Sequence, residues 1–90
     1  TNKTPSQVLT PTLSFIAYPN PTTNELIVES ILGQNGVTPI KLYSIDGKLV
    51  LQKNYYTIVG YNKINIQLPK LNSGVYIFKF GDINQRLVIN

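Results

Sequence analysis

Side chains able to do acid–base or metal chemistry are few in this chain of 90 residues. Four are carboxylic acids, Glu25, Glu29, Asp46 and Asp82, and there is no His, Cys, Met or Trp. Without His or Cys, neither a Ser-His or Cys-His relay nor an ordinary zinc or haem site can be built. We expect Asp46 and Asp82 in turns and both glutamates facing outward, so no pair of acids converges as a glycosidase site requires. The sequence predicts no enzyme, no cofactor and no metal site.

Three tyrosines form the other chemically interesting group. Tyr55, Tyr56 and Tyr61 could make a stacking platform for a sugar ring, and β-sandwich domains often carry such sites. Against this, Trp is absent, and clustered tyrosines commonly cover sheet edges. An accessory carbohydrate- or protein-binding module is therefore the alternative to the function inferred below.

The charge of the chain is basic but dispersed. Eight Lys and Arg residues against four acids give a formal net charge of +4. No basic cluster or recognised motif indicates nucleic-acid binding. Lys48, Lys79 and Arg86 could meet an acidic receptor surface, although solvated lysines on exposed strand faces explain them more simply. No stretch of about 18 apolar residues is present, so we expect no membrane insertion.

The elements that must position these residues are strands. The chain holds 11 Ile, 7 Val and 8 Thr, whose branched side chains fit a pleated sheet, and 10 Asn, 6 Gly and 6 Pro, which suit turns. Alternation and turn signals predict seven short strands and hence an all-β, seven-stranded antiparallel immunoglobulin-like β-sandwich. The predicted strands are residues 13–18, 25–30, 40–45, 48–52, 63–68, 75–80 and 85–89.

Period-2 alternation also predicts which side chains face the core. The predicted inward rows consist of large apolar residues: Leu26 and Val28; Ile64, Ile66 and Leu68; Tyr76, Phe78 and Phe80. The last row is placed inward because Lys79 belongs to the opposite face of its strand.

The connections are predicted from Gly, Pro, Asn and Asp. Asp46-Gly47 between two apolar runs predicts a hairpin with a type I′ turn, and residues 33–36 predict another turn. Residues 54–61 are expected to be a looser segment. Residues 1–12, polar and without periodicity, are expected to be a linker or the tail of a preceding domain, which leaves 13–90 as the folded domain.

Three landmarks follow one another along the chain. Tyr18-Pro19-Asn20-Pro21 opens the series, residues 40–50 with Asp46-Gly47-Lys48 stand in the middle, and residues 71–80 with Gly74 and Tyr76 precede a terminal strand at 85–89. In this order and spacing the chain resembles the type A C-terminal sorting domain of the type IX (Por) secretion system of Gram-negative Bacteroidetes. The resemblance covers about residues 15–90.

The resemblance implies a targeting role for the chain. Such domains lie at the C-terminus of a larger cargo protein that enters the periplasm by an N-terminal signal peptide. The outer-membrane translocon and its shuttle recognise the folded domain, and a sortase-like peptidase removes it, often anchoring the cargo to anionic lipopolysaccharide at the cell surface. We expect the cut within or just before residues 1–12, and an N-terminal cargo domain in the same chain.

The motif residues also have structural interpretations. Pro19 and Pro21 fix the lead into the sheet, Gly47 and Gly74 supply positive φ angles at turns, and Tyr76 packs in the core with its hydroxyl bonded at the rim. For the terminal strand, packing and direct translocon recognition both remain open, because a short terminal strand is easily paired by another chain. The candidate sorting residues are Pro19, Asn20, Pro21, Asp46, Gly47, Lys48, Gly74, Tyr76, Gln85, Arg86, Leu87, Val88 and Ile89.

Overall fold

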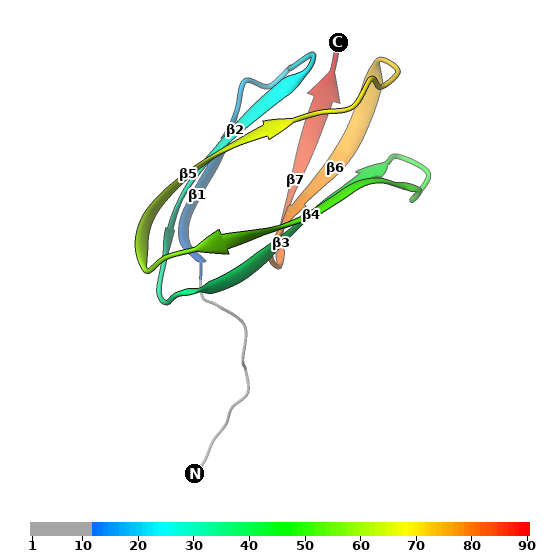
Figure 1. The fold of residues 1–90 in the computed structure, drawn as a ribbon. Helices are drawn as coiled ribbons and strands as arrows, with labels where there is room; N and C mark the ends of the chain where they lie inside the picture. The colour runs from blue at the N-terminus through cyan, green and yellow to red at the C-terminus, as the bar shows by residue number, and fades with distance from the viewer. Residues whose placement is uncertain (1–11) are drawn as a thin grey trace.

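Seven β-strands form two stacked sheets in the computed structural model, which describes residues 12–90 (Figure 1). The strands are β1 (Thr12–Tyr18), β2 (Glu25–Leu32), β3 (Gly36–Ser44), β4 (Leu49–Thr57), β5 (Gly60–Gln67), β6 (Gly74–Phe80) and β7 (Ile83–Ile89). One sheet has the order β1-β2-β5 and the other β4-β3-β6-β7, and all neighbouring pairs are antiparallel. Residues 12–90 contain no helix, so the predicted all-β immunoglobulin-like sandwich is confirmed.

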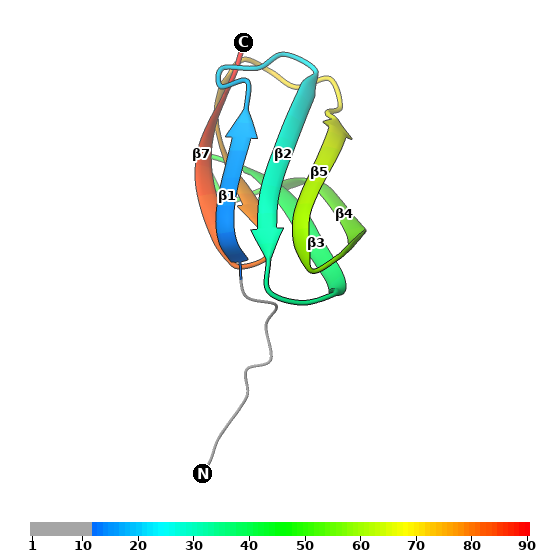
Figure 2. The same cartoon turned by 90° about the vertical axis from the view of Figure 1, so that its left-hand side faces the viewer.

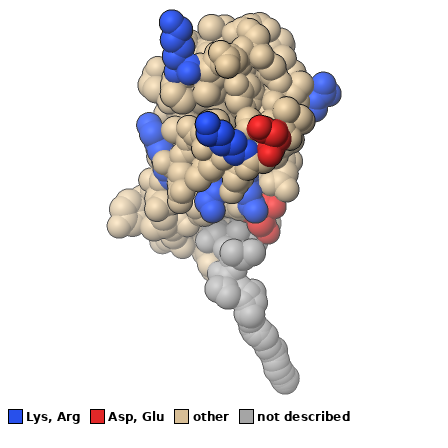
Figure 3. Space-filling model, turned by 90° about the vertical axis from the view of Figure 1, so that its right-hand side faces the viewer, with Lys and Arg blue, Asp and Glu red and all other residues tan. Residues whose placement is uncertain are grey.

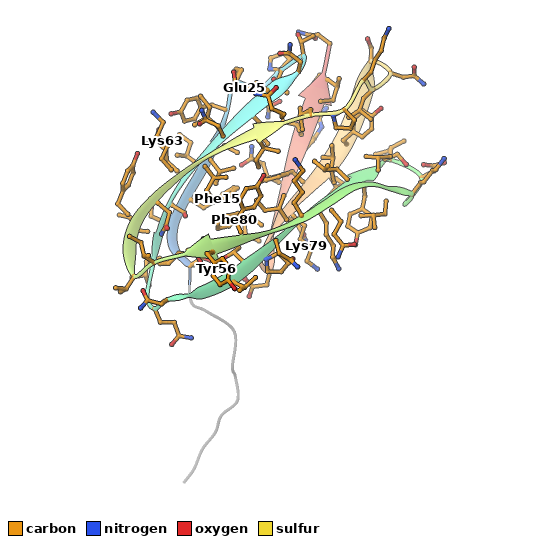
Figure 4. All side chains as sticks on the ribbon, viewed as in Figure 1. Phe15, Glu25, Tyr56, Lys63, Lys79 and Phe80 are labelled. Atoms are coloured by element: carbon orange, nitrogen blue, oxygen red, sulfur yellow. The ribbon has the colours of Figure 1, made fainter. Side chains whose placement is uncertain are left out.

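The core lies between the sheets and includes the predicted inward rows, of which Ile64 is only partly buried. Residues that were not predicted to face inward complete it: Ala17, Leu32, Ile40, Leu42, Leu87 and Ile89. Phe78 and Phe80 of β6 are fully buried, and Tyr76 is nearly so. Phe15 of β1 crosses from the other sheet to meet them, with its ring centroid 6.3 Å from that of Phe78 and 5.2 Å from that of Phe80 (Figure 4). Each large side chain buried in this way contributes roughly 1.5–3 kcal/mol. The aromatic row of β6 therefore joins the two layers.

The β3–β4 hairpin is confirmed, but its turn type is not the predicted one. The amide of Ser44 donates to the carbonyl of Lys48 at 2.8 Å and that of Gly47 to the carbonyl of Ser44 at 2.9 Å, which leaves a three-residue loop. Gly47 has a φ of 92°, whereas no residue other than glycine has a positive φ in the described range. A type I′ turn would require positive φ at Asp46 as well. The loop is instead a type I turn followed by a left-handed glycine, in which only Gly47 needs a positive φ.

Residues 54–61 are not a loose segment. They complete β4, connect through Ile58 and Val59, and begin β5. Two asparagine side chains organise this connection: Asn35 Oδ1 accepts from the amide of Val59 at 2.7 Å, and Asn62 Nδ2 donates to the carbonyl of Ile58 at 2.8 Å. The sequence did not predict these strands because polar and apolar residues alternate only weakly here. β4 lies at a sheet edge, where only part of its inward row is buried.

Other strands are longer than predicted because their neighbours extend them. β3 begins at Gly36, which pairs with Thr57 of the extended β4. Pro39 lies within β3 and needs no ladder donor on the β6 side, because the β3–β6 pairing starts at Ile40. Its carbonyl instead accepts from the amide of Gly81 at 2.9 Å.

The two ends of the sandwich carry different connections. β1 begins at one end, near the β2–β3 and β6–β7 connections, and Figure 2 shows that β7 runs beside β1 along the flank of the sandwich. The opposite end holds the β1–β2 connection, the start of β6 and the end of β7 (Figure 1). Of the expected linker, residues 1–12, only Thr12 lies within the described residues, as the first residue of β1.

Candidate functional site

The segment between β1 and β2 lies against the outer edge of β7. The amide of Thr22 donates to the carbonyl of Val88 at 2.9 Å, and the amide of Asn90 donates to the carbonyl of Thr22 at 2.8 Å. These bonds form a short parallel bridge between Thr22 and Ile89. We call residues 19–22 the clasp, because they cover the edge of the four-stranded sheet that β7 would otherwise leave free.

Asn20 extends the clasp with its side chain. Its Nδ2 donates to the carbonyl of Arg86 at 3.1 Å, while its Oδ1 accepts from the amide of Val88 at 3.0 Å. One planar amide thus meets the donor and the acceptor that a neighbouring strand would meet. Both proline bonds of the clasp, Tyr18–Pro19 and Asn20–Pro21, are cis. The first and last motifs of the sequence are therefore one hydrogen-bonded unit.

The remaining residues of the terminal strand divide between the core and the surface. Leu87 and Ile89 are 0% and 1% exposed and belong to the core, whereas Arg86 is exposed and Val88 is half-buried on the outer face. Gln85 Nε2 donates to the carbonyl of Ala17 in β1 at 3.4 Å, which links the edges of the two sheets. The terminal strand therefore contributes side chains both to the core and to the outer surface.

Tyr76 and Gly74 brace the chain beside the end of β7. The Tyr76 hydroxyl donates to the carbonyl of Asn72 at 2.8 Å, and the side chain is only 8% exposed, as predicted for a core tyrosine bonded at the rim. Gly74 has a φ of 156° and pairs with Ile89, so its positive φ is confirmed. This arrangement holds the β5–β6 connection next to the terminal strand.

Asp46, Gly47 and Lys48 occupy the hairpin and have no hydrogen bond to the clasp. Ser44 Oγ donates to the Asp46 carboxylate and accepts from the amide of Lys48 at 3.1 Å. The Ser44 hydroxyl, and then the backbone amide of Asp46 itself, lower the pKa of the Asp46 carboxyl. The middle motif therefore shapes its own turn, while the first and last motifs meet.

A polar cluster that the sequence did not predict lies on the outer face of the three-stranded sheet. Glu29 of β2 accepts a hydrogen bond from the Tyr18 hydroxyl and another, at 2.6 Å, from the Tyr61 hydroxyl. These two bonds, in that order of importance, lower the pKa of Glu29, with a smaller contribution from the charge of Lys63. Only the register of β1, β2 and β5 brings these residues together, so no local sequence signal could have found them.

The tyrosine platform is not formed. Tyr55 and Tyr56 are consecutive in β4 and point to opposite faces, with Tyr55 packed against the core and Tyr56 92% exposed. Tyr61 lies in the other sheet and bonds Glu29. These three tyrosines therefore do not form the stacking surface that a carbohydrate-binding module would need.

The described residues offer little else that resembles a reaction centre. A shallow pocket of about 270 Å³ near the start of β1 is lined by Thr12, Val37, Thr38, Pro39, Lys79, Gly81 and Asp82. Asp46 and Asp82 lie in turns at different ends of the sandwich, and no group of three potential metal-ligating side chains occurs within residues 12–90. The same residues include no helix long and apolar enough to cross a membrane.

Comparison with known protein families identifies the family of this chain. The family model described as the secretion system C-terminal sorting domain matches residues 16–90. The chain belongs to this family. The comparisons with curated proteins and with solved structures gave no match.

The match places both hydrogen-bonded motifs inside the sorting domain. It covers the clasp, the hairpin and all of β2 to β7, and of the described residues it omits only the first four of β1, 12–15. Membership makes the sorting domain a type IX secretion signal and implies export of its cargo to the cell surface or the extracellular space.

Proposed function

We propose that the sorting domain is recognised, as a folded unit, by the type IX translocon and its outer-membrane shuttle at the end where the clasp meets β7. One observation carries this proposal. The motifs that begin and end the family pattern, residues 19–21 and 85–89, are joined there by the two hydrogen bonds of the Asn20 side chain. The next residue of the clasp, Thr22, adds two backbone hydrogen bonds, to Val88 and Asn90.

The clasp gives the recognised surface a defined shape. Pro19, Asn20 and Pro21 are exposed, and Arg86 lies beside them on the adjacent strand. A receptor meeting this surface finds a rigid turn and a cation in fixed positions, so it loses little conformational entropy in binding them. An unfolded chain presents the same residues apart, which supports recognition after folding.

We infer the rest of the route from the resemblance to other sorting domains. The cargo is attached at the N-terminal side, passes through the periplasm and crosses the outer membrane with the sorting domain. A sortase-like peptidase then removes the domain and anchors the cargo at the cell surface. We place the cut within or just before residues 1–12, because a protease needs an exposed and extensible segment. The domain itself supplies no catalytic group in this scheme.

The experiment is a fusion of residues 15–90 to a periplasmic reporter in a host that carries the type IX system. We expect surface delivery of the reporter, and retention in the periplasm when residues 85–90 are deleted. Because the deletion also removes Leu87 and Ile89 from the core, Asn20→Ala tests the clasp without opening the core. We expect delivery by this variant to fall while its circular dichroism stays that of a β-sandwich.

Two results would count against the proposal in different ways. No delivery by the intact fusion would refute the sorting function itself. Equal delivery by the intact, deleted and Asn20→Ala fusions would refute recognition at the clasp and place the signal elsewhere in the domain.

A further inference from the structure

Two lysines face each other on the outer face of the four-stranded sheet. Lys41 of β3 and Lys79 of β6 are direct partners in the antiparallel register, and both are half-buried. Like charges placed directly opposite across a strand pair destabilise a sheet. The fold therefore carries an unfavourable pair that packing does not require.

Arg86 of β7 enlarges this positive cluster. It pairs with Ile77, and Lys79 pairs with Asn84, so Arg86 is the diagonal neighbour of Lys79 on the same face. Asp46 lies in the β3–β4 turn, away from this cluster, whereas Asp82 in the β6–β7 turn lines the same pocket as Lys79 at the end of the face. Figure 3, which looks at this sheet, shows Lys and Arg side chains over the face with few acidic ones among them.

The opposite outer face has the reverse character. Its strands carry Glu25 and Glu29 against Lys63 alone. Lys63 lies directly opposite Glu29 in the register, so this face carries one more acid than base, whereas the strands of the other face bring three cations together. The molecule is polar across its thickness, which steers a charged partner to one face.

Apolar side chains lie between the cations. Tyr43 and Ile77 are register partners, as are Val75 and Val88, and all four are half-buried on the same outer face. A flat surface that mixes aliphatic and aromatic side chains with cations is typical of a protein interface. Recognition of phosphate groups would instead favour converging arginines or a concave nest of backbone amides.

We propose that the outer face of the four-stranded sheet, centred on Lys41, Lys79 and Arg86, docks an acidic protein surface. The inference rests on the proposed function in one respect: we expect the partner to be a protein of the type IX apparatus. Arg86 belongs to both surfaces, because β7 contacts the clasp along its edge and presents Arg86 on its outer face. The sheet face thus continues the surface that begins at the clasp.

The test uses a photo-crosslinking residue in place of Tyr43 in the full chain, fused to a periplasmic reporter in a type IX host. We expect a crosslink to one protein through an acidic peptide, with a yield that falls as ionic strength rises. Lys41→Glu should lower the yield about tenfold or more, the effect expected for losing a close interfacial charge pair. Lys70→Glu, the same charge change in the β5–β6 connection, is the matched control and should leave the yield unchanged.

A lower crosslinking yield of Lys41→Glu cannot be explained by unfolding of the domain. The substitution replaces a repulsive cross-strand pair with an attractive one, so it should stabilise the sheet. Changing acidic residues of the crosslinked peptide to Lys should restore the yield with Lys41→Glu. Crosslinks to lipopolysaccharide alone, to a second copy of this chain alone, or to a protein whose yield ignores Lys41→Glu would each overturn the proposal. Absence of reporter delivery would count against the sorting function only, because the crosslink is measured independently of delivery.

Discussion

At the scale of single residues, Asn20 has the largest influence on the proposed site. A strand edge offers alternating backbone donors and acceptors, and an Asn side chain supplies one of each in a plane. Asn20 bonds the carbonyl of Arg86 and the amide of Val88, so it replaces a strand at the edge of β7. An unpaired edge invites pairing with other chains, and the clasp prevents this.

Replacing Asn20 should therefore loosen β7. We expect Asn20→Ala to lower the free energy of unfolding by about 1–2 kcal/mol, because two solvent-exposed hydrogen bonds are lost. Asn20→Asp should lose about half of the same amount, since it keeps the acceptor for the Val88 amide but no longer donates to the Arg86 carbonyl. Urea unfolding gives both values.

Asn24→Ala is the matched control for these variants. Asn24 lies in the same connection, and its backbone carbonyl makes the contact to the amide of Leu68 at 2.9 Å, which an alanine retains. A loss from Asn24→Ala as large as that from Asn20→Ala would show that the side-chain clasp is not what stabilises β7.

At the scale of elements, the four-stranded sheet has a well-packed inner face and an outer face on which like charges repel each other. The inner row of β6 is aromatic and buried, whereas its outer row places Lys79 opposite Lys41. Since neighbouring strands fix both side chains at one register position, the lysines can relieve their repulsion only by extending their charged ends into solvent. This sheet face is better suited to a binding partner than to the isolated domain.

Removing the like-charge pair should stabilise the domain. We expect Lys41→Glu to raise the free energy of unfolding by about 0.2–1 kcal/mol at low salt, because the cross-strand neighbour becomes oppositely charged. The gain should shrink at about 1 M salt, where such pairs are screened. Urea unfolding at both salt concentrations measures it.

The loop variant Lys70→Glu provides the reference for this measurement, and we expect it to change stability by less than about 0.5 kcal/mol. A destabilisation by Lys41→Glu at low salt would contradict the repulsion inferred from the register.

At the scale of the whole molecule, the end at which the chain enters β1 is separated from the end that we propose for recognition. β1, which continues from the N-terminal residues, starts at one end of the sandwich, and the clasp with the end of β7 lies at the other (Figure 1). A large cargo at the first end leaves the second end accessible. The outer faces of the two sheets also differ in charge, so by our proposals one end and one face of the domain meet the secretion apparatus.

This separation predicts that the position of the reporter matters. A reporter attached after Asn90 should be delivered no better than the fusion that lacks residues 85–90, because its bulk covers the clasp. The same reporter attached before residue 15 should be delivered normally. Surface labelling of intact cells measures both. Equal delivery from the two positions would show that the clasp end need not be accessible.

Much of the fold was predictable because it depends on local pattern. Branched and aromatic residues in period 2 identified most strands and the inward row of Tyr76, Phe78 and Phe80. Asp46-Gly47 located the hairpin, but the turn type depended on how β3 and β4 pair, which allowed Gly47 alone to take positive φ. The second half of β4 was missed, because at a sheet edge its alternation is weak.

What the sequence by itself determined is the all-β class, several inward rows of the core and, through the order of its motifs, the family. These properties follow from side-chain chemistry and spacing along the chain. The tertiary structure alone decided that Asn20 reaches Val88, 68 positions away, and that Lys41 faces Lys79. Such contacts depend on strand order and register, and a hydrogen bond or a like-charge pair between distant segments leaves no periodic trace in the sequence.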